Sequence, residues 1–270
     1  MTVLEILRSG VDRVRKPRGL RRQRDLLQNL AAPIGLLLVW EIAARAGLVN
    51  VRYFPAPSSI AETLGSLAAS GELWSHTSVS LQRLAVGLVI GAVPGVVLGL
   101  LMGLYRPIRV TFDPLIAATY PIPKSAILPL ILLIFGLGEA SKIAMVAIGA
   151  FYPIAINSMA GTLEINRTHL DIAKNFGAGP WQTFRTVALP GAMPMILAGI
   201  KLGVGLSLIL VVLAEMVGAR SGLGYLVYYS WQIFAVQTMY AALIVIGILG
   251  FLFNVILTEL ERVVLPWRRP

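Results

Sequence analysis

The 270-residue sequence contains no cysteine, and this absence excludes several kinds of chemistry. Disulfide frameworks, thiol nucleophiles and thiolate-bound metals or clusters all require cysteine side chains. The only histidines, His76 and His169, lie too far apart, and in segments too different, to indicate a metal pair. No segment matches the G-x-x-x-x-G-K-[ST] pattern that cradles nucleotide phosphates, so we expect this chain to bind no nucleotide, metal or other cofactor.

Charged residues are also scarce, at 13% of the chain, and hydrophobic residues make up 57%. Soluble domains contain about 25% charged residues. The mean hydropathy is +0.78, and several segments of roughly 20 residues carry almost no charge, the length that a helix needs to cross the hydrocarbon of a bilayer. The sequence therefore predicts a membrane protein with six transmembrane helices, at about residues 30–48, 84–104, 114–135, 143–162, 195–217 and 237–258.

The first of these segments has an alternative interpretation as a secretory signal, because Ala44-Arg45-Ala46 resembles a small-residue cleavage site. Glu41 interrupts the apolar run, and the polar leader before it is long for a signal. Glu41 and Arg45 lie four residues apart, which predicts a local ion pair on one helix face. We therefore interpret residues 30–48 as a membrane span.

The basic residues predict the orientation of the chain. A leader at residues 1–29, the loops on the same side and the tail at residues 263–270 with the residues just before it hold sixteen lysines and arginines, whereas the opposite loops hold four. Because cytoplasmic loops carry the excess of lysine and arginine, both termini are predicted to be cytoplasmic. The same bias explains the net charge of +10 without a nucleic-acid partner, and the leader is expected to lie on anionic lipid or on a soluble partner.

Glycine recurs at every fourth position of the second segment, from Gly87 to Gly103. These residues lie along one flank of a helix, where another backbone can approach closely. We interpret the stripe as a packing surface within one chain, with a subunit interface as the alternative.

The third segment, residues 114–135, contains four prolines together with Lys124 and Ser125. Proline removes a backbone donor, and a broken helix persists in lipid only where protein or a water-filled cavity satisfies the freed carbonyls. We expect this helix to be broken and to face a pathway or a partner, with irregular packing as an equal alternative. The candidate residues of a translocation pathway or gate are Tyr120, Lys124, Ser125, Glu215 and Arg220.

Glu215 lies near the end of the fifth segment, at membrane depth, where an ionisable group is costly unless it is paired. We expect Arg220 or a backbone donor to be its partner. The segment 221–234 that follows is too short and too polar to span, so we expect an outer-side helix or gate there.

The connection at residues 163–194 is longer than helix connections usually are. Its apolar residues argue against disorder. Residues 170–176 are predicted to form a short helix that Gly177 ends, residues 181–188 resume a helix, and Pro190 and Pro194 break the entry into the fifth span. Such a helix with exposed apolar side chains, among them Phe176, is typical of a docking element for a soluble partner, and a helix lying on the lipid surface is the alternative.

The spacing in this connection resembles the "EAA" loop of ABC importer permeases. Asp171-Ile172-Ala173 is followed after three residues by Gly177, after nine more by Val187, and after one more by Leu189-Pro190. The pattern of the family is E-A-A, three residues, G, nine residues, I, one residue, L-P, so the spacing is complete. Asp171, Ile172 and Val187 differ from it in residue type.

Over residues 30–262, the chain resembles the nitrate, sulfonate, taurine and bicarbonate branch of these permeases. The segments that carry this resemblance are Phe54–Ile60, Pro121–Ala126, Phe135–Lys142, Ala214–Ala219 and Ser221–Tyr225.

The resemblance implies an all-α type I ABC importer permease in the bacterial plasma (inner) membrane. It implies a homodimer around one pathway for a small anionic solute, and an extracytoplasmic substrate-binding protein that delivers this solute. A separate cytoplasmic ATPase subunit then binds ATP and Mg, so the chain itself is not an enzyme. The residues expected to contact the ATPase subunit are Asp171, Ile172, Ala173, Phe176, Gly177, Val187, Leu189 and Pro190.

Two other classes of protein remain as alternatives. Broken helices also occur in ion-gradient-driven secondary transporters and channels, although the two halves of this sequence show no convincing repeat. Ala219-Arg220-Ser221-Gly222 comes close to a serine nucleophile motif, but neither histidine lies within a predicted span to act as a base.

Overall fold

The computed structural model describes residues 18–268, and the side chains from residue 31 onward apart from Arg167, Lys174 and Arg268. All regular structure in this part of the chain is helical. The first seventeen residues of the predicted leader, and residues 269–270 of the predicted tail, lie outside the described residues. The chain divides into two compact units, Met1–Glu62 and Thr63–Pro270.

The first unit contains α2 (Arg18–Arg45), which holds most of the predicted first span, and the start of α3 (Pro57–Ala69). The predicted pair of Glu41 and Arg45 is confirmed, with Nε of Arg45 2.5 Å from a carboxylate oxygen. The backbone N–H of Ser58 donates to the same carboxylate at 2.9 Å. Glu41 therefore also satisfies a backbone donor in the first turn of α3.

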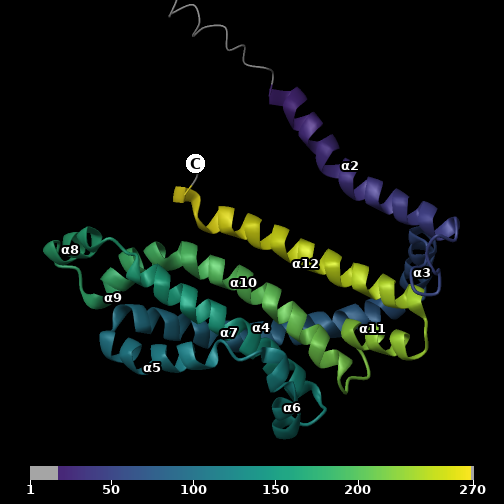
Figure 1. Cartoon of the computed structure of the whole chain (residues 1–270). Coiled ribbons are helices and arrows are strands. Elements are labelled where there is room, and N and C mark those ends of the chain that lie inside the picture. The colour runs from purple at the N-terminus through teal and green to yellow at the C-terminus, as the bar shows by residue number, and fades with distance from the viewer. Residues whose placement is uncertain (1–17, 269–270) are drawn as a thin grey trace, which may run out of the picture. The chain divides into compact units, whose positions relative to one another are not determined.

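The second unit is built on three helices, α4 (Glu72–Leu104), α7 (Glu139–Leu163) and α10 (Leu189–Met216). α7 packs against both of the others (Figure 1). The glycine stripe of α4 lies against α7, and a Cβ atom added to Gly91 would come 2.2 Å from the carbonyl oxygen of Ala147. The interpretation of the stripe as packing within one chain is confirmed.

The α4–α7 contact has a constant register. Gly91 faces Ala147, Gly95 faces Phe151 and Gly99 faces Ala155. These pairs have the same separation in sequence, 56 residues, as the ion pair of Arg83 and Glu139. Contacts that advance together along both helices mean that α4 and α7 run parallel, so the chain must return across the bundle between them.

The predicted broken third span makes this return. It consists of α5 (Arg106–Thr119) and α6 (Lys124–Phe135), which meet at a bend of 100°. Pro121 and Pro123 lie in the break and cannot donate backbone hydrogen bonds there.

α10 runs antiparallel to α7, since Gly161 faces Ala192 near one end and Gly149 faces Leu210 near the other. α11 (Leu223–Gln232) confirms the short helix expected after Glu215, and it packs against α10 and α12 (Val236–Val264). α12 returns antiparallel to α10, with an ion pair between Lys201 and Glu261. The segment 163–194 and the end of α12 therefore lie at one end of the bundle, and α11 lies at the other.

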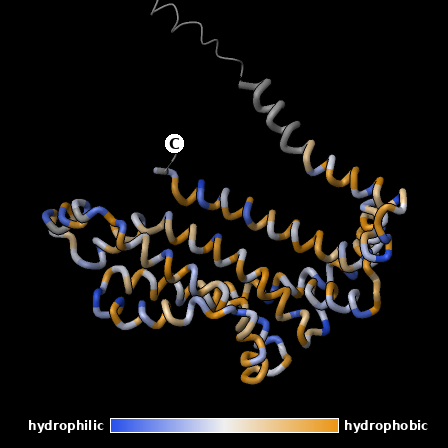
Figure 2. The backbone as a smooth tube through the Cα atoms, in the orientation of Figure 1, coloured by the Kyte–Doolittle hydropathy of each residue, from blue (hydrophilic) through white to orange (hydrophobic). Residues whose placement is uncertain are grey.

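Four helices in the described residues are long and apolar enough to cross a membrane, and the bent pair gives up to five spans. Hydrophobic residues run along these helices, with α12 as a clear example (Figure 2). The predicted first span falls on α2, which is not among them, so the total of six stays a prediction.

The α4–α7 contact can be tested with one added methyl group. We expect Gly91→Ala to lower the free energy of unfolding by about 2 kcal/mol, because the methyl group would overlap the α7 backbone and separate the helices. The measurement is thermal unfolding in detergent micelles. The matched control is Gly247→Ala in α12, where nothing lies within 4 Å, and equal changes in the two variants would contradict the proposed packing.

Candidate functional site

The segment between α7 and α10 contains a short helix with both ends capped, α8 (Arg167–Asn175). The side chain of Asn166 accepts a hydrogen bond from the backbone N–H of Thr168 at 2.9 Å, the usual N-cap arrangement. At the other end, the N–H of Ala178 donates to the carbonyl of Ala173 at 3.0 Å across Gly177, whose φ is +73°. This is a Schellman ending, in which a left-handed glycine closes the helix, so the predicted stop at Gly177 is confirmed.

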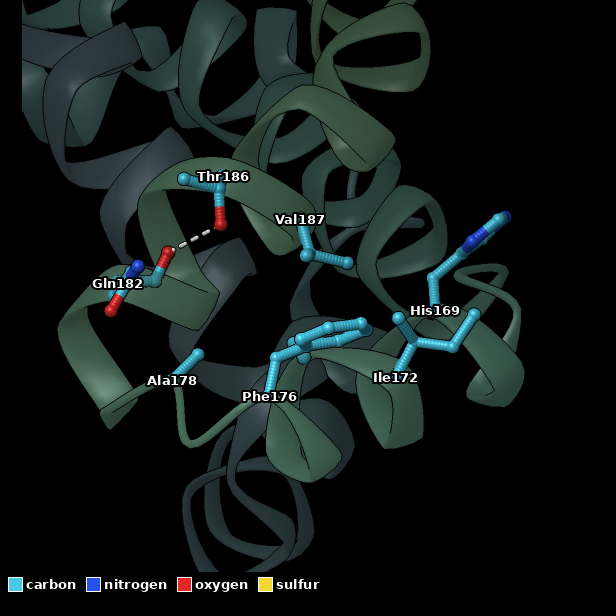
Figure 3. A pocket seen from close by; sticks show the side chains of 8 residues that line it. His169, Ile172, Phe176, Ala178, Gln182, Thr186 and Val187 are labelled. Atoms are coloured by element: carbon cyan, nitrogen blue, oxygen red, sulfur yellow. Dashed lines mark hydrogen bonds between the residues drawn. The ribbon is translucent and has the colours of Figure 1, made fainter.

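Two apolar side chains at the C-terminal end of α8 are exposed. Phe176 is 87% exposed, and Ile172 is 47% exposed. Beside Phe176 is an open hollow of about 480 Å³, lined by residues of α8 and of the helical segment that follows, including Ala173, Gln182 and Val187. Figure 3 shows the ring of Phe176 lying over this hollow between the two segments. An aromatic side chain with so little cover is available to fill a pocket on another protein.

The second half of the segment, from Pro180 onward, runs into α10 without a break, and a turn at residues 176–179 separates it from α8. α9 (Pro180–Thr183) continues into a π-helical turn, Phe184–Ala188, and then directly into α10. The predicted break at Pro190 and Pro194 is therefore wrong. The N–H of Leu189 bonds to the carbonyl of Phe184, five residues back, and this wider turn gives the ring of Pro190 room that an α-helical turn would deny it.

This turn is anchored in the core of the second unit. Phe184 and Leu189 pack against a cluster formed by Leu100 of α4 with Ala192 and Ile196 of α10. Asp171 is exposed, whereas Ala173, Val187, Leu189 and Pro190 are half-buried. The eight residues predicted to contact an ATPase subunit thus fall into two groups. Five lie in α8 or directly after it, and Val187, Leu189 and Pro190 lie where the chain enters α10.

The break between α5 and α6 holds three of the candidate pathway residues. Nζ of Lys124 donates to the carbonyls of Thr119 at 3.0 Å and Tyr120 at 3.1 Å, and it lies 4.0 Å from the centre of the Tyr152 ring. Lys124 therefore satisfies carbonyls that the break leaves open, as the expectation for a broken span requires. The side chains of Tyr120 and Ser125 are exposed.

Glu215, the fourth candidate, is fully buried at the opposite end of the bundle from α8. The expected backbone donor is confirmed, since the N–H of Gly224 donates to its carboxylate at 2.9 Å. The expected partner Arg220 is wrong, because Arg220 is exposed and the ion pair is made by Arg83 of α4 at 2.9 Å. Among the described contacts, Lys124 contacts Tyr120, but no contact joins either of these residues to Glu215 or Arg220.

Arg83 is the residue that sequence reasoning missed. It lies just before the predicted second span, but α4 begins at Glu72 and buries it to 3% exposure. Two of its nitrogens donate to the two carboxylate oxygens of Glu139, both at 2.6 Å, and a third donates to Glu215 and to the carbonyl of Ser221. In the structure, the register of the α4–α7 contact continues one turn back from Gly87 and pairs Arg83 with Glu139, but the sequence alone does not give this register.

The charge balance from sequence places Lys142 among the four basic residues of the opposite loops, and this placement is wrong. Lys142 is 1% exposed within α7, and it donates to the carbonyls of Leu137, Gly138 and Gly218. We use the name Arg83 cluster for Ser80, Arg83, Glu139, Lys142 and Glu215. No group of three or more acidic or histidine residues in the described part of the chain could hold a metal ion.

Comparison with known proteins identifies the same class that the 163–194 spacing indicated. Residues 95–270 match the family model described as "Binding-protein-dependent transport system inner membrane component". The chain is 37% identical to the putative aliphatic sulfonates transport permease protein SsuC of Escherichia coli, over 87% of this chain and 89% of that protein. It is 34% identical to the taurine transport system permease protein TauC of the same organism, over 90% of each chain.

Among solved structures, the chain is similar to a chain of an inward-facing MetNI methionine ABC transporter. The TM-score is 0.55 at 25% identity, covering 69% of this chain and 93% of that one.

Two phenylalanines of the 163–194 segment are expected to have different roles, Phe184 in folding and Phe176 in docking. We expect Phe184→Ala to lower the free energy of unfolding by about 2 kcal/mol, because it removes packing against the α4–α10 core. Phe176→Ala should change it by less than about 0.5 kcal/mol, since its ring is exposed. Thermal unfolding of both variants in micelles tests this, and a large loss for Phe176→Ala would show that its ring is part of the core.

Proposed function

Because this chain belongs to the family of binding-protein-dependent transport system inner membrane components, we propose that two copies of it form the pathway of an importer for small sulfonates. The chain is the permease subunit of an ABC importer and an integral membrane protein, not an enzyme. Importers of this class work with an ATPase subunit and a substrate-binding protein. The proposal concerns the copy number, the sides of the membrane, the contact with the ATPase subunit and the substrate.

The contact with the ATPase subunit is made by α8, and the observation that carries this assignment is the exposure of Phe176 on a capped helix. The caps make α8 a rigid body, and α8 contacts the π turn that continues into α10 and packs against the core. A displacement of α8 is therefore passed to α10 and not absorbed in a flexible loop. ATP and Mg are bound by the ATPase subunit.

The end of the bundle that carries α8 faces the cytoplasm. Arg106, Arg109, Arg185 and Arg262 all lie in elements at this end, and basic residues accumulate on the cytoplasmic side of membrane proteins. α11 and the Arg83 cluster then face outward, where the substrate-binding protein docks. The predicted cytoplasmic position of the N-terminal leader follows from the same rule.

The surface on which the second copy packs is apolar, because helices of the second unit expose many hydrophobic side chains. Only 11% of the most apolar window of α12 is buried, against 44% in α7. α4 also exposes a stripe of valine and isoleucine on the side away from its glycines, including Val86, Ile90, Val93 and Val97. A second copy covers part of this surface and bilayer lipid covers the remainder.

The substrate class rests on relatives named for aliphatic sulfonates and for taurine. Both names denote compounds with a sulfonate group, which is a permanent anion at neutral pH. Lys124 and Arg220 are the pathway candidates with the matching charge, and a pathway for anions agrees with a Glu215 that is buried and paired. An ion-gradient-driven transporter or channel, the alternative from sequence, is a class to which neither named relative belongs.

The contact through α8 is tested by changing its glycine stop. We expect Gly177→Val to assemble normally but to lose substrate-stimulated ATP hydrolysis, because a β-branched residue is strained at a φ of +73° and would tilt α8. The control is Gly179→Val, two residues away, where φ is −69° and nothing lies within 4 Å. Normal stimulation in Gly177→Val would refute this role of α8.

The substrate is tested through the external partner. We expect the substrate-binding protein encoded beside this chain to hold an alkanesulfonate or taurine, which native mass spectrometry would identify, and proteoliposomes of the full complex to take up that compound with ATP. Retention of a neutral or cationic ligand would refute the sulfonate assignment and leave the role of α8 unaffected.

A further inference from the structure

The Arg83 cluster joins four helices at the end of the bundle opposite to α8. Arg83 and Ser80 come from α4, Glu139 and Lys142 from α7, and Glu215 from the last turn of α10. The start of α11 enters through the N–H groups of Leu223 and Gly224, which donate to Ser80 and to Glu215.

The charges of this cluster balance, and its polar atoms are paired. Arg83 pairs with Glu139 and Glu215, and Lys142 donates to three backbone carbonyls. Arg83, Lys142 and Glu215 are each at most 3% exposed, whereas the side chain of Glu139 is 63% exposed. Removing the charge of Arg83 would leave the buried carboxylate of Glu215 without its ion-pair partner, which is strongly unfavourable. The cluster therefore resists any motion that would separate its helices.

The turn between α10 and α11 is shaped to the cluster. Gly218 and Gly222 have φ values of +77° and +116°, in the region that side chains disfavour. A Cβ atom at Gly222 would lie 2.3 Å from the Glu215 carboxyl carbon, and one at Gly224 would lie 2.1 Å from the carbonyl oxygen of Val212. The backbone thus closes directly around the Glu215 carboxylate.

We propose that Arg83 is a positioning residue of the transport cycle, which holds the outer ends of α4, α7, α10 and α11 together as one rigid body through every nucleotide state. This inference rests on the proposed coupling through α8. α10 has 28 residues and is about 42 Å long at ~1.5 Å per residue. Because Glu215 fixes the far end of α10, a displacement of α8 rotates the whole body. If that end were free, α10 could slide along α7.

The first test measures whether the cluster stays closed, and the absence of cysteine from the sequence makes it direct. Leu223→Cys places a thiol at a position that is 1% exposed beside the cluster, and Trp231→Cys places one on the same helix at a position that is 57% exposed. The probe is a membrane-impermeant maleimide, added to the full complex without nucleotide, with ATP and Mg, and after vanadate trapping.

We expect the Leu223→Cys thiol to react at least tenfold more slowly than the Trp231→Cys thiol in all three states. A rate that rises to that of Trp231→Cys in any state would overturn the proposal, because it would show that the cluster opens during the cycle. This measurement leaves every charge of the cluster in place, so it decides the question even if the charge variants below fail to assemble.

The second test changes one member of the cluster at a time. Glu215→Gln keeps the shape of the side chain, and Arg83→Lys keeps the charge but not the two-pronged contact with Glu139. We expect both to retain basal ATP hydrolysis, to lose at least fivefold in stimulation by the loaded binding protein, and to expose the Leu223→Cys thiol. Glu259→Gln, which breaks an exposed ion pair within α12, is the matched control and should behave as the unaltered chain.

Full stimulation in both Glu215→Gln and Arg83→Lys would overturn the positioning role. This outcome differs from a failure of the proposed function, in which the unaltered chain itself would bind no ATPase subunit or show no stimulation.

Discussion

The close contact between α4 and α7 determines most of the second unit. Glycine at every fourth position of α4 lets the two backbones touch, and a single methyl group at Gly91 or Gly99 would overlap backbone atoms of α7. Helices in lipid gain little from apolar burial and depend on such close packing. Because the contact sets a constant register of 56 residues, it also brings Arg83 to Glu139 and makes the two helices parallel. The bent α5–α6 pair is the return crossing that this parallel arrangement requires.

The two ends of α10 lie in very different polar environments. At one end Arg83, Lys142 and Glu215 are buried, Arg83 pairs with Glu215, and Lys142 donates to backbone carbonyls. At the other end α8 leaves Phe176 and Asp171 exposed, although its backbone is capped at both ends. An exposed aromatic ring on a rigid helix gains free energy when a pocket of a partner buries it. This asymmetry follows from the contacts of the chain itself and agrees with a docking role for α8.

The sequence was most informative where a single local rule decides the structure. Gly177 could be recognised as a helix end because a left-handed residue is needed there, and the prolines around Lys124 indicated the broken span because they cannot donate backbone hydrogen bonds. The predictions failed where distant residues decide. Hydropathy placed the start of the second span after Arg83 and the start of the fourth span after Lys142. A charged residue is taken as a span boundary when its buried partner is not known. Arg220 was the nearest cation to Glu215 in sequence, but the fold brings Arg83 to it. The π turn before Pro190 could not be predicted from the sequence either, since its stability depends on the packing of Phe184 against α4.

Arg83 shows why a buried charge in a membrane protein carries information about motion as well as stability. A cluster held only by apolar side chains could slide, because one apolar contact replaces another at little cost in free energy. Arg83 contacts Glu139 through two nitrogens and contacts both Glu215 and the Ser221 carbonyl through the third. Such a planar fork tolerates neither sliding nor rotation of its partners. The helices that it joins can therefore move only together. The 100° bend between α5 and α6 lies outside this group of helices.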